Sequence, residues 1–295
     1  MRPGTSLGWE EAFLRALQAL ANPALDVFFR AITELGGDLF WLTVIFACFA
    51  LGRRRQALGL SALLVLNFYA SYAIKYAVWR PRPLIEFQRT DLVSPRTGPS
   101  LPSTHAAEAA ADLGYVAKEA RDKRAYLACA ALIVLVGLSR LYLGLHWPTD
   151  VLAGFGLGLS LLGLYSLGLE KRLMPRLVTL KALRSFRPCL ALASLSAGVL
   201  AAILTPQAWG RPSTYIGGLI AGIFSGIALA GPAQARSLRN PGDLSRAVAC
   251  VLLGLAGLAD SCLIAPSVLQ FVATALTGLW ASWIGPETLW ALGAR

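Results

Sequence analysis

The chain has 295 residues, of which 56% are hydrophobic and only 15% are charged. A soluble protein usually carries about 25% charged residues, so this composition excludes an ordinary soluble domain and indicates a protein solvated by lipid. The formal net charge of +11 would suit a nucleic-acid-binding protein, but the basic residues lie in short clusters between apolar runs. That arrangement is typical of membrane loops and argues against a nucleic-acid partner.

Residues 1–35 predict two short amphipathic helices separated at Asn22-Pro23. Hydrophobic residues recur at helical spacing, and charged residues such as Glu10 and Asp26 fall between them. This pattern is typical of helices that lie in the membrane interface rather than cross it. We therefore expect the first 35 residues to form an interfacial segment.

Apolar runs suited to membrane helices follow along the rest of the chain. They lie at 37–52, 57–79, 125–143, 150–169, 188–205, 214–231, 247–264 and 267–285. A further helix is predicted at 103–118, where Glu108 and Asp112 make the segment too polar to face lipid, so we expect neighbouring helices to cover it. The predicted fold is an all-α polytopic transmembrane bundle of about nine helices, with a core at 36–172 and additional C-terminal helices at 173–295.

Clusters of lysine and arginine predict the orientation of this bundle. With nine alternating helices, four clusters fall on one side of the membrane: Arg53–Arg55, Lys118–Arg124, Lys171–Arg187 and Arg236–Arg246. By the positive-inside bias, that side is cytoplasmic. The N-terminal helices then lie outside, and we expect an integral protein of the bacterial inner membrane.

Three polar motifs fall on the opposite, extracytoplasmic side of the predicted bundle. They are Lys75, six residues, then Arg82-Pro83; Pro102-Ser103-Thr104-His105; and Ser139-Arg140, five residues, His146, three residues, then Asp150. Taken singly, each motif has a structural explanation, as interfacial anchors, a helix cap or a surface ion pair. Their occurrence together, in order and on one predicted face, favours a shared site. Arg80, beside the first motif, suits a further phosphate contact or a lipid-headgroup anchor.

These residue types suit phosphoryl transfer through a covalent phosphohistidine. Two arginines and a lysine can neutralise a phosphate and hold its oxygens, while Ser103 at a helix start can help to cradle an oxyanion. One histidine must attack phosphorus while another protonates the leaving oxygen. Asp150 lies one helical turn after His146 and can secure the neutral tautomer of the attacking ring. The chain contains two histidines, and both fall in the motifs.

The motifs resemble those of the type 2 phosphatidic acid phosphatase superfamily, whose pattern is Lys-x6-Arg-Pro, Pro-Ser-Gly-His and Ser-Arg-x5-His-x3-Asp. The resemblance covers residues 8–172 and implies a phosphatase that needs no metal or other cofactor. It implies that phosphate is bound by Lys75, Arg82 and Arg140, assisted by Ser103, and that catalysis is carried by His105 as general acid, His146 as nucleophile and Asp150 as its orienting group. Thr104 stands where the pattern has glycine, and we count it among the phosphate-binding residues on the condition that its φ is negative.

The leading hypothesis is a phosphatase of a lipid phosphate or pyrophosphate, of the polyprenyl pyrophosphate, phosphatidylglycerol phosphate or phosphatidic acid type. The alternatives are a phosphatase of a soluble sugar phosphate, a lipid phosphotransferase, and a non-catalytic transporter or scramblase. The nine-helix topology also resembles the glucose-6-phosphatase branch of the superfamily, a likeness that names no substrate. Gly218, Gly222 and Gly226 give one C-terminal helix a small-residue face, which suits packing within the fold, the role we favour, or in a homo-oligomer.

Overall fold

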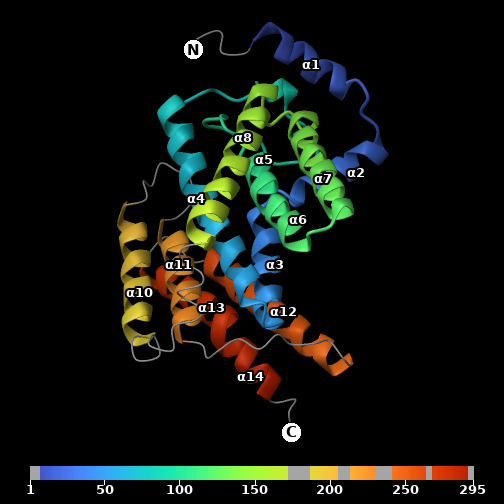
Figure 1. The fold of residues 1–295 in the computed structure, drawn as a ribbon. Helices are drawn as coiled ribbons and strands as arrows, with labels where there is room; N and C mark the ends of the chain where they lie inside the picture. Colours follow the sequence, from blue (N-terminus) through green and yellow to red (C-terminus); the bar gives the residue numbers. More distant parts are fainter. Residues whose placement is uncertain (1–6, 172–186, 205–212, 230–240, 264–267, 292–295) are drawn as a thin grey trace. The chain divides into compact units, whose positions relative to one another are not determined.

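The computed structural model describes residues 7–171, 187–204, 213–229, 241–263 and 268–291. These residues form helices and connecting loops, and no named strand occurs among them. The fold is therefore the predicted all-α bundle (Figure 1). The helices form two compact units, one of residues 1–41 with 59–171 and the other of residues 42–58 with 172–295.

The first unit contains the motifs. Its elements, two of which also contribute to the second unit, are α1 (Gly8–Gln18), α2 (Pro23–Glu34), α3 (Asp38–Ala50), α4 (Arg54–Val78), α5 (Thr104–Glu108), α6 (Gly114–Ala120), α7 (Lys123–Tyr142) and α8 (Pro148–Leu164), with a 3-10 turn at Ile85–Phe87 and π-helical turns at Ala109–Leu113 and Tyr165–Glu170. The predicted break at Asn22 is confirmed, because its side chain accepts hydrogen bonds from the amides of Ala24 and Leu25, both at 3.1 Å. The pair of α2 and α3, bent by 53°, has the length and composition of a broken span or a re-entrant loop, and the interfacial placement of α2 stays a prediction.

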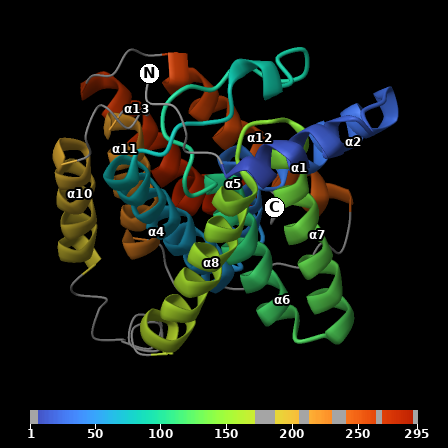
Figure 2. The ribbon, with the colours of Figure 1, turned by 90° about the horizontal axis from the view of Figure 1, so that it is seen from above.

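The helical segment from α5 to α6 is buried inside the first unit, where Figures 1 and 2 show it beside α7 and α8. Glu108 and Asp112 are 1% and 0% exposed, which confirms that neighbouring helices cover this polar segment. Two glycines let α8 approach closely: a Cβ on Gly154 would lie 2.6 Å from the carbonyl oxygen of Ser103, and one on Gly158 would lie 2.2 Å from that of Ala107. This close packing brings the third motif against the second.

The helix α1 lies over the ends of α7 and α8 that carry the third motif (Figure 1). Leu14 packs with Phe87 and Trp147 in a small buried cluster. Gln18 donates through Nε2 to the carbonyl oxygens of Phe87 at 2.7 Å and Tyr142 at 3.0 Å. Leu14, from the hydrophobic face predicted from sequence, therefore packs on protein, whereas Phe13 and Leu20 are 41% and 63% exposed.

The second unit contains the C-terminal helices α10 (Arg187–Leu204), α11 (Ser213–Leu229), α12 (Pro241–Leu263), α13 (Val268–Leu279) and α14 (Gly285–Ala291), with a π-helical turn at Trp280–Ile284. The small-residue face of α11 packs inside this unit. A Cβ on Gly218 would lie 1.8 Å from Oγ1 of Thr274, and one on Gly222 would lie 2.1 Å from the carbonyl oxygen of Ala275. This face therefore serves the fold, as we favoured.

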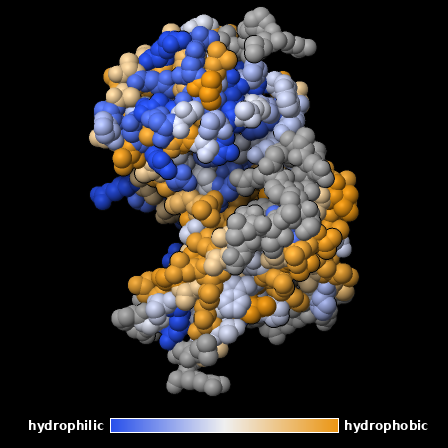
Figure 3. Space-filling model, turned by 180° about the vertical axis from the view of Figure 1, so that it is seen from behind, coloured by the Kyte–Doolittle hydropathy of each residue, from blue (hydrophilic) through white to orange (hydrophobic). Residues whose placement is uncertain are grey.

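Five helical segments of the described chain are long and apolar enough to cross a membrane, and the bent pair of α2 and α3 would make six. The five are Arg54–Val78, Lys123–Tyr142, Pro148–Glu170, Gly242–Ala259 and Val268–Ala291. Two shorter apolar helices, Pro188–Leu204 and Ile216–Leu229, accompany them, so the predicted number of about nine membrane helices was approximate. Hydrophobic side chains cover much of the second unit on the face drawn in Figure 3. The chain is an integral membrane protein; its orientation stays a prediction, because basic residues in 172–186 and 230–240 lie outside the described residues.

Candidate active site

Lys75, in the last turn of α4, fixes the loop that leads to the second motif. The residue is 3% exposed, and its ammonium group donates to the carbonyl oxygens of Ser100 at 3.0 Å and Pro102 at 2.5 Å. Ser100 in turn bonds back to the first motif, through its amide to the carbonyl oxygen of Arg80 at 2.7 Å and through its hydroxyl to that of Pro81 at 3.1 Å. The first two motifs are therefore joined through one lysine and one serine.

Ser103 begins the buried helix and contacts the third motif. Its hydroxyl caps α5 by accepting from the amide of Ala106 at 3.5 Å, and its own amide donates to the carbonyl oxygen of Asp150 at 2.9 Å. Thr104 is the first residue of α5. The non-glycine residues with positive φ in the described chain are Trp79 and Arg121, so the φ of Thr104 is negative and satisfies the condition set by the missing glycine.

The third motif spans a tight turn between α7 and α8. Gly144 has a φ of +67°, and a Cβ there would lie 1.8 Å from the carbonyl oxygen of Phe87, so this turn requires glycine. His146 follows and is 2% exposed. As predicted, Pro148 occupies the first position of α8, and the backbone amide of Trp147 donates to Oδ2 of Asp150 at 2.8 Å. The start of α8 thereby fixes the carboxylate beside His146.

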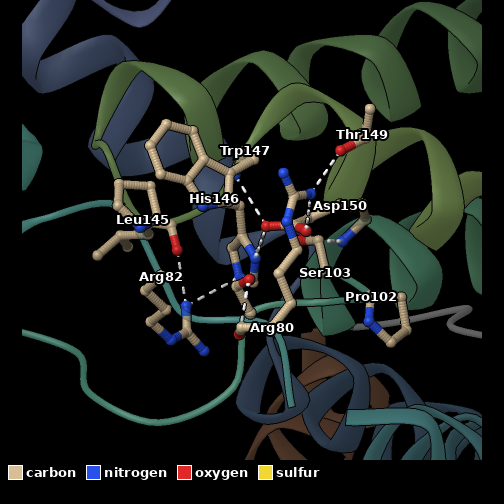
Figure 4. A network of polar contacts seen from close by, with 12 residues as sticks. Arg80, Arg82, Pro102, Ser103, Leu145, His146, Trp147, Thr149 and Asp150 are labelled. Carbon is tan, nitrogen blue, oxygen red and sulfur yellow. Dashed lines mark hydrogen bonds and ion pairs between the residues drawn. The ribbon is translucent and has the colours of Figure 1, made fainter. Parts of the chain in front are cut away.

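The surroundings of His146 fix the tautomer of its ring. Nη1 of Arg82 lies 3.1 Å from Nε2 of His146 and also donates to the carbonyl oxygen of Leu145 at 2.7 Å. Because a guanidinium can only donate, Nε2 must be the acceptor and the ring proton must lie on Nδ1. Nδ1 faces Oδ2 of Asp150 at 3.6 Å, slightly beyond hydrogen-bonding distance (Figure 4). Burial, together with the positive charge of Arg82, lowers the pKa of His146 well below its ordinary value, so the ring is neutral at neutral pH.

Two arginines of the site keep donors that no described residue uses. Arg140 is 6% exposed and donates through Nη1 to the hydroxyl of Thr33 at 2.7 Å. The Nε atoms of Arg140 and of Arg82 are buried and have no hydrogen-bond partner among the described residues. Burial and the charge of Arg96 lower the pKa of Arg82 to about 10, which leaves it cationic at neutral pH. Buried cations with unused N–H groups suit a bound oxyanion.

The structure brings most of the predicted site residues together. Arg82 contacts His146, whose ring faces Asp150, and the amide of Ser103 donates to the carbonyl oxygen of Asp150. Lys75 reaches this group through the carbonyl oxygen of Pro102, the residue before Ser103. Arg140 and His105 both act electrostatically on His146. Among the described residues, none bonds to the side chain of Thr104, so its phosphate-binding role stays a prediction.

Sequence reasoning missed several residues of this region. Arg80, which the sequence predicts to contact phosphate or a lipid headgroup, donates to Oδ1 of Asp150 at 2.8 Å and to Glu10 and Thr149 at 2.5 Å each, and these contacts were not predicted. The positive charge of Arg96, in the loop before the second motif, lowers the pKa of Arg82, and the sequence did not predict that Arg96 belongs to this region. The repeated Arg-Pro at 80–83 was the feature of the sequence that drew attention to Arg80, and no feature of the sequence placed Glu10 at the site.

Comparisons with known proteins identify related chains. The family model of the PAP2 superfamily matches residues 56–174. Phosphatidylglycerophosphatase B of Bacillus subtilis (strain 168) is 34% identical over 167 residues, which cover 52% of this chain and 79% of that protein. An undecaprenyl-diphosphatase of Sulfolobus acidocaldarius is 30% identical over 132 residues, which cover 43% of this chain and 62%, less than two thirds, of that protein. The crystal structure of the first transmembrane PAP2 type phosphatidylglycerolphosphate phosphatase from Bacillus subtilis is 30% identical, covers 56% of this chain and 86% of its own, and has a TM-score of 0.45.

Proposed function

The chain belongs to the PAP2 superfamily, and we propose that it is a membrane phosphatase that hydrolyses a lipid phosphate or pyrophosphate through a phosphohistidine on His146. The observation that carries this proposal is the contact between Arg82 and Nε2 of His146 at 3.1 Å. It supports a neutral imidazole whose lone pair faces a cationic pocket, which is the state needed for attack on phosphorus. The lipid substrate is supported by the lipid and polyprenyl phosphatases among the relatives.

In the first step, Nε2 of His146 attacks phosphorus and the bond from phosphorus to the leaving oxygen breaks. His105 gives its proton to that oxygen, so the alcohol or phosphate leaves in protonated form. The ring of His146 becomes a cationic phosphohistidine, which the carboxylate of Asp150 stabilises from the Nδ1 side at 3.6 Å. Lys75, Arg82 and Arg140 hold the phosphoryl oxygens.

In the second step, a water molecule attacks the phosphohistidine. His105, now neutral, takes a proton from the water while the bond from phosphorus to Nε2 breaks. Inorganic phosphate leaves, His146 returns to its neutral form and His105 is protonated again. The three cations supply the charge stabilisation that a metal supplies in other phosphatases, so we expect activity to persist in a chelator.

The test is phosphate release by the purified full-length chain in detergent. The panel contains phosphatidylglycerol phosphate, phosphatidic acid, undecaprenyl pyrophosphate and glucose 6-phosphate, each with and without EDTA. We expect release from at least one lipid and none from His146→Ala. A labelled substrate should also leave label on the wild type that is labile to acid and stable to base, as expected for a phosphohistidine.

Other outcomes would point to the alternatives. Release from glucose 6-phosphate alone would replace the lipid by a soluble ester as substrate. Transfer of label to an added lipid alcohol would indicate a phosphotransferase. Full activity of His146→Ala would remove the nucleophile, and binding of lipid phosphates without any turnover would support a non-catalytic transporter or scramblase.

The extracytoplasmic position of the site is part of the proposal and needs its own test. In oriented inner-membrane vesicles, a membrane-impermeant reagent should reach a cysteine placed at the exposed Asp91 only from the extracytoplasmic side. Labelling from the cytoplasmic side alone would invert the topology.

A further inference from the structure

Glu10 of α1 is a fully buried carboxylate in a helix whose pattern suggested a solvated polar face. Its side chain is 0% exposed. Oε1 accepts from the hydroxyl of Thr149 at 2.6 Å and from its amide at 3.3 Å, while Oε2 accepts from Nη2 of Arg80 at 2.5 Å and from the amide of Leu7 at 2.9 Å. Both oxygens are therefore bonded, and three of the four bonds reach residues within the first and third motifs.

Arg80 carries this contact onward to the catalytic pair. Nη1 of Arg80 donates to Oδ1 of Asp150 at 2.8 Å and to the hydroxyl of Thr149 at 2.5 Å. With Oδ1 held by Arg80, the other oxygen of Asp150 faces the amide of Trp147 at 2.8 Å and Nδ1 of His146 at 3.6 Å. Figure 4 shows the Asp150 carboxylate between the His146 ring and the Arg80 guanidinium. Glu10, Arg80, Asp150 and His146 thus form a continuous chain of polar contacts.

We propose that Glu10 and Arg80 are positioning residues for phosphoryl transfer, which hold the carboxylate of Asp150 toward His146. The inference rests on the proposed function of the same site. It adds a residue outside 56–174, the part of the chain that the family model matches, and gives α1 a role in the reaction. The remaining contacts of α1, through Leu14 and Gln18, keep Glu10 in place.

The charges explain why two acids share one arginine. If Arg80 paired with Asp150 alone, it would neutralise the carboxylate that must stabilise a cationic phosphohistidine. Glu10 provides a second negative charge at 2.5 Å from Arg80, so the buried group of Glu10, Arg80 and Asp150 keeps one net negative charge beside His146. In a site with little water, that charge acts strongly on the ring.

A purely structural tether of α1 would use the same contacts, but the two explanations differ in their effect on pH dependence. Glu10→Gln keeps the shape and removes a negative charge, so the pKa of His146 should fall and the acid limb of kcat/KM should move to lower pH. Arg80→Gln removes a positive charge, so the same limb should move to higher pH. Loss of a tether alone would lower the thermal stability of both variants and leave the acid limb at its wild-type position.

The experiment measures kcat, KM and the pH profile of the full-length chain on its best phosphate substrate. Each positioning variant should lower kcat by about ten- to hundredfold, the scale of a misaligned catalytic group, with KM changed less than about twofold. Glu86→Gln is the matched control, because Glu86 is 59% exposed and its ion pair with Arg15, at 3.6 Å, lies at the surface. It should match the wild type in rate and pH profile.

The outcomes separate this inference from the proposed function. A wild type that is inactive on every phosphate would refute the proposed function, whereas an active wild type with unchanged kcat and pH limb in Glu10→Gln would overturn the positioning role. An acid limb of kcat/KM that stays in place, or that moves in the same direction in Glu10→Gln and Arg80→Gln, would also overturn the positioning role. If Glu10→Gln does not fold, Arg80→Gln decides: a lower kcat with the acid limb of kcat/KM moved to higher pH supports the role, and an unmoved limb or a wild-type kcat refutes it.

Discussion

Asp150→Asn is the substitution that most directly tests the electrostatics of the site. Asp150 is 0% exposed, and its oxygens accept from Nη1 of Arg80 and the amide of Trp147, both at 2.8 Å. Asparagine has nearly the same shape, so the substitution removes the charge while the start of α8 keeps its geometry. The proposed phosphohistidine on His146 would then carry its positive charge without a partner.

The size of the effect follows from the distance. Nδ1 of His146 lies 3.6 Å from Oδ2 of Asp150, and two unit charges at that separation interact by roughly 4–5 kcal/mol at an effective dielectric constant of about 20. Arg80 shares the carboxylate, so we take about 3 kcal/mol as the part that the ring feels in the transition state. At 1.36 kcal/mol per tenfold change in rate, kcat should fall by about a hundredfold.

The assay is the initial rate of phosphate release at saturating substrate, with elution as a single peak and the thermal midpoint as checks of folding. Asp91→Asn is the control, because Asp91 is 60% exposed and pairs with Arg89 at 3.0 Å on the surface. It should keep the wild-type kcat. A loss of kcat below about threefold in Asp150→Asn, or a change confined to KM, would refute the argument that this carboxylate stabilises charge on the ring.

Further predictions concern pH dependence, backbone and packing. Arg82→Gln should move the acid limb of kcat/KM to higher pH, because the Arg82 charge lowers the pKa of His146, and a limb at the wild-type position would contradict this cause. Gly144→Ala should lower the thermal midpoint by an amount equivalent to about 1–3 kcal/mol, since the turn has a φ of +67° and the new Cβ would meet the carbonyl of Phe87. Asp112→Leu should keep activity, and its thermal midpoint should be equal to or higher than that of the wild type, because the buried carboxyl has no hydrogen-bond partner among the described residues. A clear loss of stability would indicate an unrecognised bond.

Local signals in the sequence were sufficient to predict much of the fold. Asn22-Pro23 and Ser103 sit at helix starts as their side chains require, and Pro148 takes the first position of α8. Such residues act through backbone groups within one turn, so the sequence alone contains the relevant information. The approach of Asp150 to His146 was predictable for the same reason, because Pro148 starts the helix and Asp150, its third residue, accepts from the amide of Trp147 next to His146.

Long-range polar contacts could not be predicted in this way. Glu10 and Arg80 are separated by 70 residues, and Glu10 carries the spacing of a charge on an exposed helix face. Its burial depends on where α1 packs, which is set by contacts such as that of Leu14 with Phe87 and Trp147. The bend of 53° between α2 and α3 was likewise not predicted, because the amphipathic pattern of α2 gave no sign that it combines with the apolar α3.

The charges of the site fit a phosphate monoester. Lys75, Arg82 and Arg140 supply three positive charges, and the group of Glu10, Arg80 and Asp150 supplies one net negative charge. With His146 neutral and His105 protonated as the general acid, the excess of positive charge favours a phosphate dianion, which carries close to two negative charges at neutral pH. Attack by His146 then moves positive charge onto the ring, on the side where the net negative charge lies. The two acids around Arg80 therefore serve the step in which charge develops, rather than the binding of the ground state.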